Sequence, residues 1–520
     1  MGCCNKSFMR LLLLIVFYVS VSIASSANGQ AREKSVDTPS TTNLDRFILE
    51  LYKAAYPEEV APGIAVVVVK DNQIIYLKGF GYADLEAKRK VTPRTVFYIA
   101  SSTKPFFGLA AALLDADKKI DLDAPLSRYL PAVRLQAPLS PDTITLRDLL
   151  THTHGIGPVG LGPVVFRTAF SGEFTPDLLI ALLAKHKPAE SGRAFRYGNI
   201  GYNVASLAID AALKENWKDV LRRKVINPLR MTSTTAYLSK IDPKRLAMPY
   251  FEDEKEYVLV PYTKRDANMH AAGGLVSTAE DLAKWLQVNI NDGRMGGKQV
   301  FPAAVVEETH RKYANQQTEF AGVKRYGYGL GWNIGTYDGD TLIHHHGGFS
   351  AFYTHVSFMP QHRIGVAVLA HEGTLGGRLA EAIAQYVYDT LLAKPLAEKK
   401  WAKTLSEAPQ MVGQSRRELA AQNARRAARQ RPLPHTLEAY IGTYDSPEGG
   451  RMEWRIVNGR LEASIGLLRS LAEVYDANSN ALRVELVPGQ GEVVRFAFSE
   501  NRNQAKGLEY NGMIFERVER

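Results

Sequence analysis

The stretch FYIASSTKPFFGLAAALLDADKKIDLDAP, residues 97–125, places a serine and a lysine three residues apart at the start of an apolar, helix-like pattern. Pro105 favours the first turn of that helix, so Ser101 should lie at its N-terminus, where free N–H groups favour developing negative charge. Residues i and i+3 share a helix face, which brings the amine of Lys104 beside the hydroxyl of Ser101. A desolvated lysine can take the proton from a serine nucleophile. Alone, however, Ser-x-x-Lys equally fits a capping serine and a surface lysine.

Two further motifs follow in the chain. Tyr197-x-Asn199 stands before a helical pattern, 96 residues after Ser101, and His345-x-Gly347 lies 148 residues later in IHHHGGFSAF, residues 343–352. A tyrosine is more often a core residue and an asparagine a turn or cap residue, so only the joint pattern points to catalysis.

The order Ser-x-x-Lys, Tyr-x-Asn, His-x-Gly resembles that of penicillin-recognising serine hydrolases. The chain is similar to the class C beta-lactamase-like family, which includes D-Ala-D-Ala peptidases, D-aminopeptidases and esterases. Further similar stretches are KGFGYAD, ITLRDLLTHTHGIG, AAGGLVSTAEDLAKWL and YGYGLGW, so the resemblance covers roughly residues 44–392. Motifs in this order and context are far more specific than any one of them.

The resemblance implies the catalytic roles. Ser101 is expected to be the acylated nucleophile, with Lys104 and Tyr197 sharing the general-base and general-acid work. A positive charge on Lys104 is expected to lower the pKa of Tyr197. No cofactor and no metal is expected for this chemistry.

The resemblance also implies the substrate-binding groups. Asn199 is expected to donate to the substrate carbonyl or amide, and His345 to polarise the catalytic tyrosine or contact a substrate carboxylate. Gly347 should let substrate lie against the strand. The N–H groups of Ser101 and Gly348 should form the oxyanion hole.

Two departures from the family pattern bear on the substrate. His-x-Gly stands in place of Lys-Thr-Gly, which removes a fixed positive charge that helps hold a beta-lactam carboxylate. The family's LLTHTSG reads LLTHTHG here, and its usual Asn after the last sheet strand is His371. The first change favours an esterase or peptidase over a dedicated lactamase, and the second is expected to alter substrate preference.

Two alternatives stay open at this point. A zinc-dependent hydrolase could use His152, His154, His344 and His346, although consecutive histidines in a strand point to opposite faces and three or four ligands must converge. A non-catalytic sensor could keep the fold and bind penicillin or peptidoglycan fragments. The intact serine, lysine, tyrosine and asparagine favour the enzyme.

The predicted fold class is α+β: an antiparallel sheet flanked by helices, a mostly helical subdomain, and then a small all-β antiparallel barrel. Residues 63–84 read as a hairpin around Asp71-Asn72, and 352–370 as a second strand pair, so the sheet is built from both ends of the domain. The short strands after residue 433 resemble a lipocalin-like barrel. The predicted boundaries are 1–27 signal peptide, 28–42 flexible leader, 43–395 hydrolase domain, 396–432 basic helical linker and 433–520 barrel.

The N-terminus predicts secretion. Lys6 and Arg10 precede an apolar run, residues 11–23, and small residues that suit cleavage near Ala24 or Ala27. A periplasmic location follows, with an uncleaved membrane anchor as the minority alternative. Both cysteines, Cys3 and Cys4, would leave with the signal, so the mature protein would have no disulfide.

The net charge of +10 is concentrated in one segment. Positions 394–431 contain ten Lys or Arg residues and three Glu, and the rest of the chain after the predicted signal peptide is close to neutral. This excludes a basic nucleic-acid-binding surface and leaves open contact of that segment with a membrane surface or cell-wall polymer. A small molecule or peptide is the expected partner, and the oligomeric state stays unpredicted.

Overall fold

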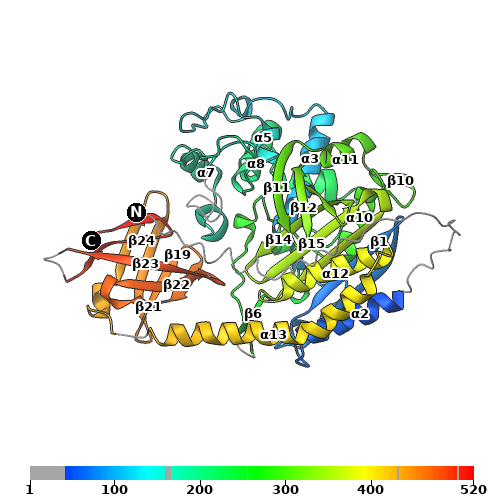
Figure 1. Cartoon of the computed structure of the whole chain (residues 1–520). Helices are drawn as coiled ribbons and strands as arrows, with labels where there is room; N and C mark the ends of the chain where they lie inside the picture. The colour runs from blue at the N-terminus through cyan, green and yellow to red at the C-terminus, as the bar shows by residue number, and fades with distance from the viewer. Residues whose placement is uncertain (1–40, 158–165, 254–255, 430–431, 500–502, 520) are drawn as a thin grey trace, which may run out of the picture.

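An eight-stranded antiparallel sheet forms the centre of the larger domain in this computed structural model, which describes residues 41–157, 166–253, 256–429, 432–499 and 503–519 (Figure 1). In spatial order its strands are β11 (Ala314–Phe320), β12 (Val323–Tyr328), β13 (Asn333–Tyr337), β14 (Asp340–Phe349), β15 (Phe352–Met359), β16 (Ile364–Ala370), β1 (Ile64–Lys70) and β2 (Gln73–Phe80).

The sheet joins both ends of this domain, as the sequence predicts. β1 and β2 form a hairpin whose turn residues Asp71 and Asn72 have φ of +49° and +69°, as the tight hairpin turn requires. β1 then pairs with β16, with Ile64 opposite Ala370. β1 is an unbroken apolar run because helices cover both faces of the sheet there.

Alternating side chains of β1 enter two different cores. Ala65, Val67 and Val69 pack on the side of α3 (Lys104–Ala116) and α10 (Ala279–Ile290). Ile64, Val66 and Val68 pack on the side of α2 (Thr41–Ala55) and α12 (Gly376–Leu391). The predicted antiparallel sheet between layers of helices is therefore confirmed.

The chain between β2 and β11 is mostly helical, which also confirms the prediction. Besides α3 and α10, its helices are η1 (Ala100–Thr103), α4 (Leu126–Tyr129), α5 (Leu146–Leu150), η2 (Phe166–Phe170), α7 (Pro176–Leu183), α8 (Ile200–Leu213), α9 (Trp217–Leu221), η3 (Arg222–Ile226), η4 (Leu238–Lys240), η5 (Pro243–Arg245), η6 (Asp266–Asn268) and α11 (Ala303–His310). Short two-stranded ladders interrupt them: β3 (Tyr82–Asp84) with β4 (Arg89–Lys90), β5 (Phe97–Tyr98) with β8 (Val276–Ser277), β6 (Tyr250–Asp253) with β7 (Glu256–Leu259), and β9 (Arg294–Met295) with β10 (Lys298–Gln299).

A nine-stranded antiparallel sheet forms the C-terminal domain as a nearly closed barrel, as predicted. Its strands are β17 (Gly442–Ser446), β18 (Gly450–Val457), β19 (Arg460–Ile465), β20 (Leu468–Leu471), β21 (Glu473–Asp476), β22 (Ala481–Val487), β23 (Gln490–Phe498), β24 (Ala505–Tyr510) and β25 (Met513–Arg517). The first and last strands pair, with Tyr444 opposite Arg517. Tyr440 and Tyr444 lie fully buried in its core.

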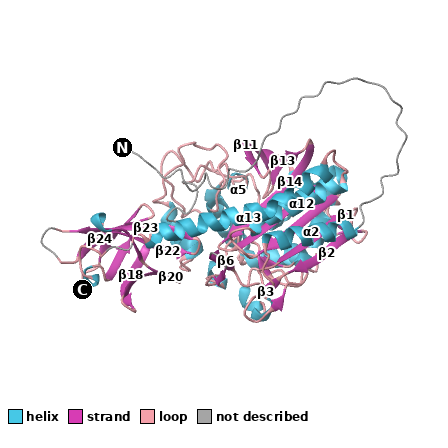
Figure 2. Cartoon of the chain, turned by 60° about the horizontal axis from the view of Figure 1, so that its bottom comes forward, coloured by secondary structure: helices cyan, strands magenta, loops and turns pink. Residues whose placement is uncertain are grey.

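The basic segment forms a single long helix, α13 (Ala397–Ala427), that runs from α2 and α12 to the barrel (Figures 1 and 2). Two of its arginines are paired rather than free in solvent. Arg416 binds Glu58 and the buried Glu252, and Arg426 binds Glu473 at the barrel edge. Part of the basic character therefore joins this helix to the domains on either side.

The predicted signal peptide and most of the predicted leader lie outside the described residues. The leader was expected to reach residue 42, but α2 begins at Thr41, so its last two residues are helical. Within the described part of the chain, no helix combines the length and apolarity needed to cross a membrane.

Candidate active site

Ser101 lies in a tight 3-10 turn, η1, between β5 and α3, not in the first turn of the α-helix itself. Ala100, just before it, has φ of +44°, a conformation that costs energy for a residue with a side chain. The turn is held by the backbone: the N–H of Ile99 donates to Leu275 at 3.0 Å and that of Ser102 to Ile99 at 3.0 Å. This leaves Ser101 partly exposed on a rigid base.

Lys104 begins α3 directly after this turn, and its side chain is fully buried. The amine Nζ lies 3.1 Å from Ser101 Oγ, 2.9 Å from Asn199 Oδ1 and 2.7 Å from the carbonyl of Ala272. α8 supports two of these contacts, because Asn199 precedes its first turn and Asn203 Oδ1 accepts from the N–H of Ala272 at 3.2 Å. The predicted serine, lysine and asparagine thus lie together.

The contacts of Lys104 define the direction of its lone pair. Burial without a carboxylate partner holds its pKa well below the usual value, which favours the neutral amine. A neutral amine has two N–H bonds and one lone pair. Asn199 Oδ1 and the Ala272 carbonyl can only accept, so they take the two N–H bonds. The lone pair is then directed at Ser101 Oγ, the arrangement a general base requires.

Tyr197 lies over the same amine, with its ring centroid 4.9 Å from Lys104 Nζ. Burial raises its pKa to about 12, and a hydrogen bond with Ser101 and the charge of Arg325 offset this only in part. The expectation that Lys104 lowers this pKa is therefore wrong: burial raises it, and the groups that act in the other direction are Ser101 and Arg325. The raised pKa favours the protonated phenol at neutral pH, a form that can donate a proton.

The ring of His152 packs against the ring of Tyr197. Its ring centroid lies 4.7 Å from Tyr197 and 4.8 Å from Tyr328, and its backbone has φ of +61°. Both ring nitrogens are buried without a hydrogen-bond partner among the described residues. Burial lowers its pKa well below 6.5, so the ring is neutral. The sequence marks His152 only as a possible metal ligand, and no motif indicates that its ring packs against Tyr197.

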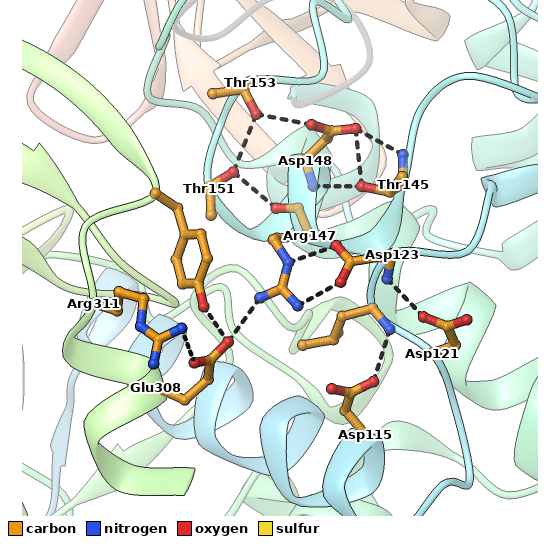
Figure 3. Close-up of polar contacts among 12 residues, drawn as sticks. Asp115, Asp121, Asp123, Thr145, Arg147, Asp148, Thr151, Thr153, Glu308 and Arg311 are labelled. Carbon is orange, nitrogen blue, oxygen red and sulfur yellow. Dashed lines mark hydrogen bonds and ion pairs between the residues drawn. The ribbon is translucent and has the colours of Figure 1, made fainter. Parts of the chain in front are cut away.

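A polar network holds the loop that carries His152 (Figure 3). Thr145 and Asp148 form a reciprocal capping box at the start of α5. Thr151 Oγ1 donates to the carbonyl of Arg147 at 2.8 Å, while the guanidinium of Arg147 binds Asp123 and Glu308. The stretch ITLRDLLTHTHGIG therefore holds His152 in place, and His152 in turn packs against Tyr197.

His345 lies on the site side of β14, with its ring 5.8 Å from that of Tyr197. Nδ1 is 2.7 Å from the carbonyl of His346 and must carry the proton, since a carbonyl only accepts. Nε2 therefore accepts from the hydroxyl of Tyr328 at 3.3 Å. Burial lowers the pKa of His345 well below 6.5, so this residue does not restore the charge lost with Lys-Thr-Gly.

Gly347 and Gly348 have different surroundings. A Cβ at position 347 would lie 2.0 Å from the carbonyl oxygen of Ile99 and 3.2 Å from the N–H of Ser102. The expected space for substrate is thus occupied by the protein's own nucleophile turn, which packs directly on β14. Gly348 is exposed, with no atom within 4 Å of its would-be Cβ, and its role in the oxyanion hole stays a prediction.

The four histidines of the zinc alternative do not converge. His344 and His346 share the opposite face of β14, toward α12, whereas His152 lies beside Tyr197 and His154 Nδ1 accepts from the N–H of Ile156 at 2.9 Å. Strand alternation predicts this separation.

The barrel reaches the edge of the site through η2. The N–H of Leu467, in the β19–β20 turn, donates to the carbonyl of Ser171 at 2.8 Å. Phe170 in turn stacks on Phe349 at the end of β14, with centroids 5.2 Å apart. Beside them lies Lys264, whose amine donates to the carbonyl of Ala169 at 2.9 Å and whose pKa burial lowers to about 7. No sequence motif marked this lysine.

Comparison with known proteins agrees with this geometry. A family model described as Beta-lactamase matches residues 45–388. Protein flp of Staphylococcus aureus (strain NCTC 8325 / PS 47) is 25% identical over 312 residues, which are 60% of this chain and 59% of that protein. Unguisins hydrolase ungD' of Aspergillus campestris (strain IBT 28561) is 28% identical over 353 residues, 64% of this chain and 62% of that protein. The match thus spans about three fifths of each relative.

Solved structures share the fold. The octameric penicillin-binding protein homologue from Pyrococcus abyssi superposes with a TM-score of 0.58 at 23% identity, covering 91% of this chain and 99% of that chain. EstCE1, a hydrolase with promiscuous acyltransferase activity, gives a TM-score of 0.56 at 22% identity, covering 67% and 99%.

Proposed function

The chain belongs to the beta-lactamase family, and from this premise we propose that it is a secreted serine hydrolase that cleaves an ester or amide through an acyl-enzyme on Ser101. One observation carries the proposal. Lys104 is buried, burial holds its pKa well below the usual value, and its amine lies 3.1 Å from the serine hydroxyl. A surface lysine after a capping serine, the alternative reading of the motif, would have none of these properties.

In the proposed first step, Ser101 Oγ attacks the substrate carbonyl carbon while its proton passes to Lys104 Nζ. The carbonyl π electrons move to oxygen, where the N–H groups of Ser101 and Gly348 stabilise the negative charge. The tetrahedral intermediate then collapses and expels the leaving group. Tyr197 gives its proton to that group and regains one from Lys104, which restores the neutral amine.

Deacylation reverses these roles. Water attacks the acyl carbon while Tyr197 takes one proton from the water and passes its own proton to Lys104. When the tetrahedral intermediate collapses, Lys104 returns a proton to the departing Ser101 Oγ. Because Lys104 must be neutral to start, the acylation rate should rise with pH through its lowered pKa and level off well below the ordinary lysine value.

The neutral His345 bears on substrate class. A site that held a beta-lactam carboxylate by a fixed cation at this position would lose that attraction here. We therefore place an ester or a short amide, including a D-amino-acid peptide, before a beta-lactam. The hydrolase name of the fungal relative agrees with a small-molecule or peptide substrate.

Active-site labelling tests the mechanism. Wild type and Ser101→Ala are incubated with a fluorescent fluorophosphonate and a fluorescent penicillin. Wild type should react with the fluorophosphonate and Ser101→Ala should not; equal labelling of the two would refute the serine mechanism. Labelling by penicillin with slow turnover would favour a peptidase, and fluorophosphonate labelling alone an esterase. Loss of activity with EDTA but not with fluorophosphonate would indicate the zinc alternative, and a single acylation without turnover a sensor.

Secretion to the periplasm rests on the predicted signal peptide. N-terminal sequencing of the protein from cell fractions tests it directly. Cleavage near Ala24 or Ala27 in the periplasmic fraction is the expected result, and a membrane-bound protein that keeps residues 1–27 would indicate an uncleaved anchor.

A further inference from the structure

A second cluster of ionisable side chains lies behind the candidate active site, on the other face of β14. His346 on β14 and His355 on β15 are direct cross-strand partners, and Glu381 reaches them from α12. His346 Nε2 lies 3.1 Å from Glu381 Oε1, and His355 Nδ1 lies 2.9 Å from the same oxygen. All three ligand atoms lie within 4.8 Å of one another.

The orientation of His346 distinguishes this cluster from an ordinary hydrogen-bonded one. Although Nε2 is so close to Oε1, it is buried and makes no hydrogen bond with any described group. Atoms that share a metal behave in this way, since each is directed at a common centre rather than at its neighbour. His355 differs, because its Nδ1 lies 2.9 Å from the same carboxylate oxygen in hydrogen-bonding geometry, so this nitrogen must be free of its proton to bind a metal.

We propose that His346, His355 and Glu381 bind a divalent transition-metal ion, with zinc as the preferred ion. Two imidazole nitrogens and one carboxylate oxygen are a donor set that zinc accepts, with a fourth position left for water or another oxygen. Bonds of about 2.0–2.2 Å at tetrahedral angles place ligand atoms about 3.3–3.5 Å apart. Each nitrogen therefore needs to move away from Oε1 by only a few tenths of an ångström, and the two nitrogens already lie within 4.8 Å of each other.

The surroundings of His355 suit a metal ligand. Its second nitrogen, Nε2, lies 2.6 Å from Ser357 Oγ, which is 2.8 Å from the hydroxyl of Tyr388. A metal-bound histidine commonly donates its other N–H to such a partner, which fixes the ring orientation. Glu381 and His346 each keep 12% of their side chain exposed, whereas the ligand atom Nε2 of His346 is buried.

Arg325 disfavours binding of the ion, so its replacement tests the proposal. Its guanidinium donates to His346 Nδ1 at 3.1 Å, which is the nitrogen that must carry the proton when Nε2 binds metal. Metal binding therefore requires Arg325 to release Nδ1. A glutamine at this position would offer an acceptor oxygen for Nδ1–H and would remove the positive charge, so Arg325→Gln should strengthen zinc binding.

The role assigned to the ion is structural. It would link α12 to β14 and β15 on the face of the sheet opposite the candidate active site, at the level of residues 345–348. Ser101 lies on the other side of the sheet, so the ion is not part of the proposed acyl transfer. The inference does not depend on the proposed function, and each can fail without the other.

The experiment uses the tag-free full chain after removal of metal by EDTA and desalting. Zinc is titrated in competition with a chromophoric chelator, and cobalt is added separately because four-coordinate Co²⁺ with nitrogen and oxygen ligands has an intense visible spectrum. One equivalent of zinc and that spectrum are expected for wild type. Glu381→Gln, which can still accept from Tyr353, should weaken binding at least about 100-fold, and Arg325→Gln should strengthen it by about 10-fold or more.

His362→Gln is the matched control, because His362 also contacts one carboxylate, Asp340, but belongs to no three-ligand group among the described residues. It should bind zinc as wild type does. Absence of zinc binding by wild type, or binding that Glu381→Gln leaves unchanged, would overturn the proposal. The cobalt spectrum of wild type decides the matter even if a variant fails to fold, and fluorophosphonate labelling of metal-free protein should be retained.

Discussion

The contact of Gly347 with the nucleophile turn yields the most direct test of the site. Replacing Gly347 by Ala puts a Cβ 2.0 Å from the carbonyl oxygen of Ile99 and 2.9 Å from its carbon. These are backbone atoms of the turn that presents Ser101, so no side chain can move aside. β14 or the turn must shift by about 1 Å to reach an ordinary contact, which should cost about 1–3 kcal/mol of stability as overpacking does.

The same shift displaces Ser101 Oγ from Lys104 Nζ. A misplacement of about 1 Å in an active site can reduce the rate about 100-fold. Gly347→Ala should therefore lose about 100-fold in fluorophosphonate labelling rate and unfold at a lower temperature. Gly348→Ala is the control, since its Cβ has no atom within 4 Å and its backbone N–H is retained. Its stability should change by less than about 0.5 kcal/mol.

The assay measures labelling rate constants and thermal unfolding of wild type and the two variants side by side. Equal behaviour of Gly347→Ala and Gly348→Ala in both measurements would refute the packing of β14 against the turn. A variant that is destabilised but labels at the wild-type rate would show that the turn moves without carrying Ser101 from its base.

Three further predictions follow from other contacts. Lys104→Met, which keeps the apolar stem but has no lone pair, should reduce the labelling rate about 10²–10⁴-fold while the fold persists; unchanged labelling would exclude Lys104 as the base. Arg416→Ala leaves the buried carboxylate of Glu252 without its partner and should cost about 3 kcal/mol or more, whereas the exposed neighbour Arg417→Ala should have little effect in the same denaturation series. Burial lowers the pKa of His371 to about 4, so the unfolded chain binds a proton there below about 6.5 while the folded chain does not. Stability should fall from pH 6.5 toward pH 4, by up to about 3 kcal/mol from this residue, and His371→Asn should flatten that slope; an unaltered slope would contradict the assignment.

The sequence predicted the elements that have a strong local pattern. The hairpin at Asp71-Asn72, the pairing of β15 with β16 and the barrel strands all follow from apolar runs and turn residues. The grouping of Ser101, Lys104 and Asn199 followed from motif order, because each motif stands at the start of a helix or within a strand that the fold brings to one edge.

The electrostatics of the site could not be predicted in this way. The pKa of Tyr197 depends on how completely its hydroxyl is buried, and burial is set by side chains such as His152 and Tyr328 that lie 45 and 131 residues away in the chain. The tautomer of His345 likewise depends on a carbonyl and a hydroxyl from the folded sheet. A family motif gives the residue type at each position, but not the burial, neighbouring charges and hydrogen bonds that set its pKa.

The run His344-His345-His346 shows both what the sequence predicts and what it does not. Strand alternation predicts that the central histidine faces the catalytic side and its neighbours the other, and the structure has this arrangement. What the neighbours contact is decided by Glu381, 35 residues later on α12, and by Arg325, two strands away. The three histidines are therefore not one site. One strand therefore carries the proposed substrate-binding residues on one face and the proposed metal ligand on the other, so a substitution on either face tests one proposal and leaves the other intact.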